Sequence, residues 1–334
     1  MRRHRKLVQN IAVLTTVLLL FLLFSAFLFG RWTKQSGPLE EATFVVIPKG
    51  SGSRQVASIL EEAGVIDMPY VFMVKGRMSG LDKRLRAGEY QFPPKVSMID
   101  AMEKIAKGEI YYHRITLPEG KTTGQFLLLI EANPNLSGDI SIEATEGELL
   151  PETYSFERGM QRDEIVKQAK DAMAKVKDKA WRNRMPDMPL KSVEEMMVLA
   201  SIIEKETAVP AERGTVASVF VNRLKKRMKL QTDPTVIYAI TNGSYELGRG
   251  LKKADLSVDS PYNTYKHYGL PPKPICNPSK ESIWAAVNPE FSDYLYFVAD
   301  GKGGHNFSNN LEEHNNNVRS WVKDLKAKKQ TKAE

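Results

Sequence analysis

The feature that most limits how this chain can fold is an uncharged apolar run near its N-terminus, from Ile11 to Phe29. A helix of about 20 apolar residues spans the hydrocarbon core of a bilayer, and Asp, Lys or Arg at its centre would be costly. A cleaved signal peptide is the alternative, but its apolar region is usually shorter and ends in a small-x-small site. This run is long and ends in Phe-Leu-Phe, so the sequence predicts one transmembrane helix over residues 11–30.

Basic residues on the two sides of this run indicate its orientation. The near side holds a basic cluster, whereas basic residues on the far side are fewer and are soon followed by acidic ones: Arg2, Arg3, Arg5 and Lys6 against Arg31, Lys34, Glu40 and Glu41. The positive-inside rule therefore places residues 1–10 in the cytoplasm. Everything after Trp32 is expected outside the cytoplasm, as in a single-pass membrane protein.

The net charge of +8 is partly concentrated in the N-terminal cluster and the C-terminal lysines, which include the basic tail, residues 328–334. Neither run interleaves aromatic with basic residues, so nucleic acid is not an expected partner. The single cysteine, Cys276, excludes an internal disulfide and a CxxC metal knuckle. The five histidines form no HExxH motif, and no GxSxG or SxxK motif is present. The sequence therefore predicts no metal, no cofactor and no serine or cysteine nucleophile.

The pattern of the sequence after the apolar run predicts two domains. Residues 31–42 are polar and read as a stalk, and residues 43–117 mix short strand and helix patterns in an α+β module without evident chemistry. Residues 118–148, rich in Asn, Pro, Ser and Gly towards their end, are expected as a connection. Residues 149–327 are mainly helical and include a β-hairpin around the turn Asp300–Gly304. The expected fold class is therefore α+β.

Two glutamates near the end of one apolar helix are the candidates for acid–base chemistry. A capping box at Ser192 starts this helix, and Pro210 ends it near Ala208. Apolar residues cover most of its faces, so the helix should be buried. Residues two apart lie about 200° apart around a helix axis, so Glu204 and Glu206 should point in nearly opposite directions. They cannot form one dyad.

Position along the helix bears on the choice between the two glutamates. The C-terminal end of a helix carries partial negative charge, which disfavours a nearby carboxylate. A partly buried Glu in the last turn should therefore have a raised pKa, as a general acid near neutral pH requires. Glu206 is closer to the end. A solvated polar helix terminus is the alternative, and spacing alone leaves both interpretations open.

Six motifs follow one another along the chain: ASIIEKETA (200–208), VFVNRL (219–224), LQTDPTVIY (230–238), YNTY (262–265), GLPP (269–272) and YFVADGKGGH (296–305). They resemble the endolytic murein transglycosylase family (MltG-like, formerly YceG-like). The resemblance covers essentially the whole chain, including the single anchor and a first domain similar to a LysM-like module. In this family the catalytic Glu is the second acidic residue of the Glu-Lys-Glu element, which implies Glu206.

The resemblance implies a lytic transglycosylase, a carbon–oxygen lyase (EC 4.2.2 class) that cleaves between N-acetylmuramic acid and N-acetylglucosamine. One Glu protonates the glycosidic oxygen and then takes the proton of the muramoyl 6-hydroxyl, leaving a 1,6-anhydro end and helping to terminate glycan polymerisation. No second carboxylate is needed, unlike in the usual glycosidase. The implied setting is the cell inner (plasma) membrane with a periplasmic catalytic domain. The implied partners are glycan strands, the membrane and peptidoglycan synthases.

Polar and aromatic residues around these motifs are candidate contacts to a sugar strand. Aromatic faces in a segment bounded by Pro and Gly suit a sugar, and polar residues after a flexible glycine turn are more often binding than structural. Asp233-Pro234 is interpreted as a helix N-cap with Pro at the first position. The expected substrate-binding residues are Glu152, Tyr154, Glu204, Gln231, Thr232, Tyr262, Asn263, Thr264, Tyr265, His305 and Asn306.

Two functions from other classes stay open at this point. One is a non-catalytic peptidoglycan-binding scaffold, in which the Glu-Lys-Glu helix end is merely polar. The other is a hydrolytic muramidase with a second carboxylate, for which Glu152 and Asp233 are the candidates. A hydrolase would leave a reducing end in place of an anhydro end.

Overall fold

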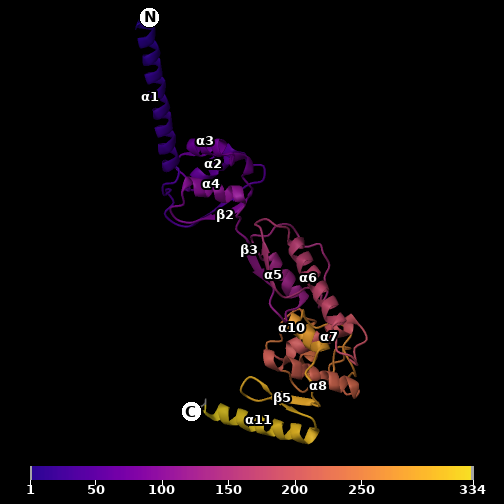
Figure 1. The fold of residues 1–334 in the computed structure, drawn as a ribbon. Coiled ribbons are helices and arrows are strands. Elements are labelled where there is room, and N and C mark those ends of the chain that lie inside the picture. The colour runs from indigo at the N-terminus through magenta and orange to yellow at the C-terminus, as the bar shows by residue number, and fades with distance from the viewer. Residues whose placement is uncertain (1, 332–334) are drawn as a thin grey trace. The chain divides into compact units, whose positions relative to one another are not determined.

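The computed structural model describes residues 2–331 (Figure 1). Residues 332–334, part of the expected basic tail, lie outside the described residues, as does the first residue of the expected cytoplasmic segment. The chain forms two compact units, one up to His113 and the other from Arg114 onward. Helices and two-stranded sheets occur in the chain together, which confirms the mixed α and β class.

The N-terminal helix α1 (Arg2–Trp32) contains the expected spanning segment. Its stretch Gln9–Trp32 is long and apolar enough to cross a membrane, and no other helix in the described part of the chain is. Large apolar side chains along it are exposed, Leu19 and Phe21 among them. By length and composition, α1 is a helix of the kind that the sequence predicts.

The rest of the first unit is a small sheet with helices packed on it. Strand β1 (Thr43–Ile47) pairs antiparallel with β2 (Gly88–Phe92), with Val45 opposite Tyr90. The helical elements are α2 (Ser53–Glu62), α3 (Pro69–Ser79), the 3₁₀ turn η1 (Asp82–Arg84) and α4 (Met98–Lys107). Ser97 caps α4 as its sequence indicates, by accepting from the Asp100 backbone N–H. Their shared core includes Val45, Leu60, Phe72, Tyr90 and Phe92.

Strand β3 (His113–Thr116) starts at the last residue of the first unit and continues into the second, where it pairs with β4 (Thr153–Phe156). Helix α5 (Thr123–Glu131) packs against α6 (Arg162–Arg182), and both contribute to one buried cluster. Helix α5 lies within the segment 118–148, and its Phe126 and Ile130 side chains are buried. The end of this segment is held from a distance: Oδ1 of the buried Asn277 accepts from the backbone N–H groups of Gly147 and Leu149. Composition alone could not reveal such distant partners.

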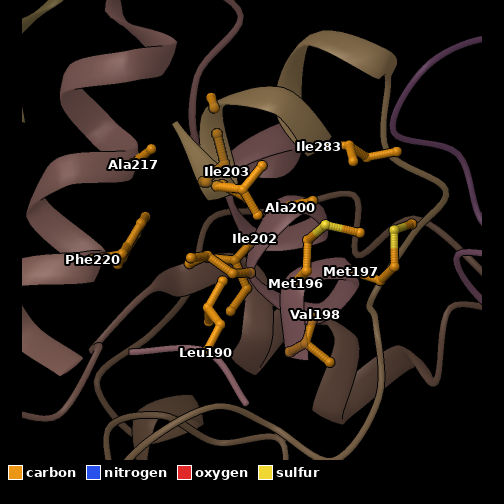
Figure 2. Packing of buried hydrophobic residues seen from close by; sticks show 14 of the residues in the cluster. Leu190, Met196, Met197, Val198, Ala200, Ile202, Ile203, Ala217, Phe220 and Ile283 are labelled. Carbon is orange, nitrogen blue, oxygen red and sulfur yellow. The ribbon is translucent and has the colours of Figure 1, made fainter. Parts of the chain in front are cut away.

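Helix α7 (Val193–Glu206) is the centre of the second unit. The Ser192 hydroxyl accepts from the Glu195 backbone N–H, which confirms the cap, and every residue from Met196 to Ile203 is buried. Helices α6, α8 (Arg213–Lys225), α9 (Asp233–Thr241) and α10 (Lys280–Val287) contact α7. Figure 2 shows Ile203 of α7 in the cluster that also holds Phe220 of α8 and Ile283 of α10. The helix ends two residues before the expected Ala208, because Thr207 is already extended.

The remaining elements surround this core. They are the 3₁₀ turns η2 (Pro210–Glu212) and η3 (Asp255–Ser257), the strands β5 (Tyr296–Ala299) and β6 (His305–Ser308), and α11 (Leu311–Thr331). Strands β5 and β6 form the expected antiparallel hairpin, against which α11 lies (Figure 1). The N-cap of α9 is Thr232 and not the expected Asp233, and Pro234 lies in the first turn. The Thr232 side chain makes no capping bond there, which leaves its hydroxyl available for another partner.

The core around α7 generates a stability prediction. Phe220 is 1% exposed and its ring meets Phe297 edge-on, so Phe220→Ala should leave a cavity and lower the free energy of unfolding by about 3–5 kcal/mol. The matched control is Phe291→Ala, because that ring is fully exposed and its loss should cost less than about 0.5 kcal/mol. Denaturant unfolding of both variants measures the difference. Equal effects would contradict the packing described here.

Candidate functional site

Glu206 is the last residue of α7, and its carboxyl group lies in a partly enclosed position. Thr232 Oγ1 donates a hydrogen bond to Glu206 Oε2 over 2.7 Å. Burial raises the pKa of Glu206 and the negative charge of Asp233 raises it further, whereas the Thr232 bond and the charges of His305 and Arg223 oppose the rise. The net direction is upward, as the sequence predicts, so this environment favours the protonated form more than solvent would.

Glu204 occupies a different environment. Its Oε2 accepts from the Ser279 backbone N–H over 2.9 Å and from the Ser279 hydroxyl over 2.5 Å. Ser279 is the N-cap of α10, so the Glu204 carboxylate fixes the point where that helix begins. The two glutamates therefore have separate partners, in agreement with their angular separation on the helix. These contacts support a structural role for Glu204 better than they support the expected contact with a sugar.

The segment before α9 is shaped to direct Thr232 toward Glu206. Gln231 has a φ of 47°, in the left-handed region, and its backbone N–H donates to the Thr264 carbonyl over 3.2 Å. The Thr232 backbone N–H donates to Thr264 Oγ1 over 3.1 Å, and Thr264 Oγ1 also lies 2.8 Å from Thr235 Oγ1. Thr264 is buried, so it supports the site from behind. The Gln231 side chain is exposed and remains available to a ligand.

Asn263 is also buried beneath the site. Its side-chain amide donates to the carbonyls of Leu256 and Val258, over 3.0 and 2.8 Å, and its Oδ1 accepts from the Tyr265 backbone N–H over 3.0 Å. These bonds use the polar groups of a side chain that is 0% exposed. Asn263 therefore holds the 256–265 segment in shape. This structural role differs from the sugar contact expected of it.

Two tyrosines border the same region. The Tyr265 hydroxyl donates to Asp233 Oδ1 over 2.7 Å, and burial together with Asp233 raises the pKa of Tyr265. The Tyr262 ring lies 4.9 Å from the Tyr238 ring of α9, centroid to centroid. The carboxylate of Asp233, which raises the pKa of Glu206, is thus held by Tyr265. Tyr262 and Tyr265 are both half-buried, with part of each side chain accessible.

The hairpin contributes His305, at the start of β6. Its backbone N–H donates to Glu212 Oε1 over 2.9 Å, and its Nδ1 lies 2.7 Å from Glu212 Oε2. A Cβ on the preceding Gly304 would lie 2.5 Å from Glu212 Oε1, so glycine permits this close approach. The ring also meets Phe297 edge-on. His305 is thus oriented by a carboxylate, and the neighbouring Asn306 is exposed.

Arg223 of α8 belongs to this site, and the sequence interpretation assigned it no role. Its Nε donates to the Leu295 carbonyl over 2.6 Å and its Nη1 to the Leu230 carbonyl over 2.7 Å. The guanidinium group lies 5.2 Å from the centre of the Tyr296 ring and lowers the pKa of Glu206. The signal in the sequence for such a role was a basic residue within the mostly apolar VFVNRL motif. Glu212, which holds His305, carried no such signal.

Glu152 and Tyr154 lie in other surroundings. The Tyr154 hydroxyl is buried and donates to the Leu150 carbonyl over 2.7 Å, and Glu152 forms an ion pair with Lys280 at the surface. Neither shares a partner with Glu206 among the contacts of the described residues. Glu152 is therefore poorly supported as a second carboxylate beside Glu206.

Cys276 and the acidic and histidine side chains are the groups that other kinds of chemistry would use. Cys276 is buried, its Sγ lies 3.4 Å from the Ser201 carbonyl, and burial raises its pKa. A buried thiol of this kind behaves as a core residue. Within residues 2–331, no group of three or more His, Cys, Asp or Glu side chains could hold a metal ion.

Comparison with known proteins places the chain in a family. A model of the YceG-like family matches residues 45–320. An endolytic murein transglycosylase of Bacillus subtilis (strain 168) is 32% identical, over 89% of this chain and 90% of its own length. One from Streptococcus pneumoniae serotype 2 (strain D39 / NCTC 7466) is 30% identical over 83% of this chain, which spans 58% of that relative. A crystal structure titled as a yceG-like protein, from Listeria monocytogenes, is 35% identical, over 83% of this chain and 99% of its own, with a TM-score of 0.49.

The family match includes all six motifs that the sequence analysis identified, and it spans both structural units. The resemblance inferred from those motifs is confirmed: this chain belongs to the YceG-like family.

Proposed function

We propose that this chain is a membrane-anchored endolytic lytic transglycosylase of peptidoglycan, with Glu206 as its acid and then its base. The observation that carries the proposal is the enclosed carboxyl group of Glu206, whose pKa is raised and whose Oε2 is held by Thr232. The relatives named endolytic murein transglycosylases support the enzyme class, a lyase. Glycan strands are accordingly the substrate.

The chemistry proceeds in two proton transfers. The neutral Glu206 carboxyl donates its proton to the glycosidic oxygen as the bond from that oxygen to the muramoyl anomeric carbon breaks. The resulting carboxylate accepts the proton of the muramoyl 6-hydroxyl as that oxygen bonds to the anomeric carbon. The products are a 1,6-anhydro end and a free hydroxyl, and the proton is back on Glu206. Thr232, Arg223 and His305 favour the transient carboxylate.

A hydrolytic route with Asp233 as second carboxylate is the competing function, because the charge of Asp233 acts on Glu206. Asp233 already accepts a hydrogen bond from Tyr265. This contact suits a carboxylate that supplies a fixed charge better than one that acts as a base to activate water. Mass analysis of the digestion products separates the two functions. Anhydro ends support the lyase, and reducing ends support the hydrolase.

The decisive variant is Glu206→Gln, which keeps the side-chain shape but cannot donate a proton and then accept one. General acid–base catalysis contributes about 10²–10⁴ in rate, so release of anhydro-muropeptides should fall at least that far while the fold survives. The matched control is Glu204→Gln, which retains an oxygen to accept from Ser279 and should keep measurable activity. A fully active Glu206→Gln protein would reject the assignment and favour the non-catalytic scaffold.

The pH profile provides a signed test of the same group. Activity requires protonated Glu206 and should be lost as pH rises through its raised pKa. Thr232→Val removes a bond that favours the carboxylate, so the alkaline limb should move to higher pH by about one unit. Asp233→Asn removes a charge that disfavours the carboxylate, so the limb should move to lower pH. Profiles of kcat/KM measure both, and shifts in the same direction would contradict the described electrostatics.

The first unit is proposed to be a LysM-like module that contacts or positions the glycan. The order β1–α2–α3–β2, with β1 and β2 antiparallel, supports this assignment. Helix α1 is proposed as its membrane anchor, with the N-terminus cytoplasmic and both units in the periplasm of an inner membrane. Such an anchor would hold the enzyme at the membrane, close to the peptidoglycan synthases that are its proposed partners. It would meet the glycan strands there as the synthases release them.

Protease accessibility tests this topology. Protease added outside spheroplasts should degrade the chain beyond Trp32, because the basic residues that precede the apolar run favour a cytoplasmic N-terminus. A cytoplasmic marker protein that stays intact serves as the control for lysis. Protection of the body of the protein in intact spheroplasts would reverse the proposed orientation.

A further inference from the structure

A cavity of about 450 Å³ lies along one face of α9. Pro234, Ile237, Tyr238 and Thr241 line it from this helix, at the i, i+3, i+4, i+7 spacing of a single helical face. Lys205 of α7 lines it as well and directly precedes Glu206. Pro234 follows Thr232, whose hydroxyl bonds Glu206, by two residues. Lys205 and Pro234 therefore bring one end of the cavity near the proposed catalytic group, although Glu206 itself does not line it.

The opposite wall of the cavity is a defined structure. It includes residues 245–249, which follow α9, and residues 119–122, which precede α5. The Thr122 hydroxyl donates to the Gly243 carbonyl over 2.9 Å, which joins the 119–122 segment to the chain just before residue 245. Gly243 has a φ of +70°, and a Cβ there would lie 2.9 Å from both Thr122 Cγ2 and Tyr238 Cε2. Glycine at this position thus permits the wall to close.

Two ammonium groups in the cavity have weakly held partners. Lys121 Nζ lies 2.8 Å from Glu246 Oε1, in a pair whose side chains are 40% and 75% exposed, and exposed pairs of this kind contribute little stability. Lys205 Nζ donates to the Gly120 carbonyl over 3.3 Å. Both could exchange these partners for a ligand carboxylate, which would form a charge-assisted hydrogen bond.

We propose that this cavity binds the stem peptide carried by the muramic acid residue at the cleavage site, with Lys121 and Lys205 receiving peptide carboxylates. The inference rests on the proposed function, because the peptide is attached through the lactyl group of the sugar whose bond is broken. It must therefore lie near Glu206, and Lys205 and Pro234 bring one end of the cavity into that neighbourhood. The apolar surfaces of Ile237 and Tyr238 suit the methyl groups of the alanine residues in such a peptide.

The dimensions agree with this ligand. From Pro234 to Thr241 the helix rises roughly 10 Å at 1.5 Å per residue. An extended peptide advances about 3.3 Å per residue, so about three residues fit along this length. The cavity volume also falls within the range of about 300–1,000 Å³ typical of small-ligand sites.

Direct binding tests the proposal without requiring turnover. The probe is a soluble N-acetylmuramoyl tetrapeptide, which has no glycosidic bond to cleave, titrated calorimetrically into the full chain in detergent. Lys121→Ala and Lys205→Ala should each raise Kd about tenfold, the loss of one charge-assisted bond. Lys253→Ala is the matched control, since this exposed lysine lies outside the cavity lining and its loss should leave Kd unchanged.

A variant of opposite sign guards against misfolding. Glu246→Gln removes the carboxylate that competes for Lys121, so Kd should fall, a change that a damaged fold would not produce. The same tetrapeptide with its carboxylates amidated should bind at least tenfold more weakly. Absent binding, equal binding of the amidated probe, or a Kd indifferent to Lys121, Lys205 and Glu246 would overturn the inference.

The two proposals fail in different experiments. Loss of tetrapeptide binding in a protein that still releases anhydro ends would remove the peptide site and leave the proposed function intact. Retained binding in a protein whose Glu206→Gln variant stays fully active would remove the catalytic assignment instead.

Discussion

Burial of α7 on nearly all its faces is the constraint on which the second unit depends. The polar residues in the last turn of such a helix lie against neighbouring elements. They need partners there, because a buried charge without a partner is costly. Glu204 is satisfied by Ser279 at the start of α10, and Glu206 is bonded to Thr232 at the start of α9. The end of one buried helix thereby positions the beginnings of two others. The two glutamates, separated by one residue, thus differ in role: Glu204 supports α10, and Glu206 is the proposed acid and base.

The hydroxyl that meets Glu206 is itself held by a buried polar network. Thr264 bonds both the backbone of Thr232 and the hydroxyl of Thr235, and Asn263 fixes the segment that carries Thr264. Fully satisfied networks of this kind rigidify a site, whereas partly satisfied ones are costly. Residues that the sequence suggested as sugar contacts are therefore better understood as the support that holds Thr232 in place. Of the residues proposed to contact the sugar, Gln231 and Asn306 are among the more accessible.

Local patterns predicted the local features of this fold. The cap at Ser192, the apolar faces of α7 and the glycine-rich turn of the hairpin each depend on residues within a few positions of one another, and the structure contains all three. The helical angle between Glu204 and Glu206 is a local property too. Contacts between distant segments were beyond such patterns. Glu212 meets His305 across 93 positions, and the polar segment before β4 is held by Asn277 from more than a hundred positions away.

Arg223 shows why the site could be predicted only in part. In sequence it is one basic residue in a helix. Nothing nearby indicates that its guanidinium group would be buried against three backbone carbonyls and the Tyr296 ring. Its importance comes from a balance at Glu206 that no single neighbour determines. Burial and Asp233 favour the proton, while Thr232, His305 and Arg223 favour its loss. In the proposed mechanism Glu206 first gives a proton and then takes one back. Such a group needs both influences, because either alone would fix it in one state. The proposed mechanism thus accounts for a single carboxylate surrounded by groups of opposing effect, which come from α8, α9 and the hairpin.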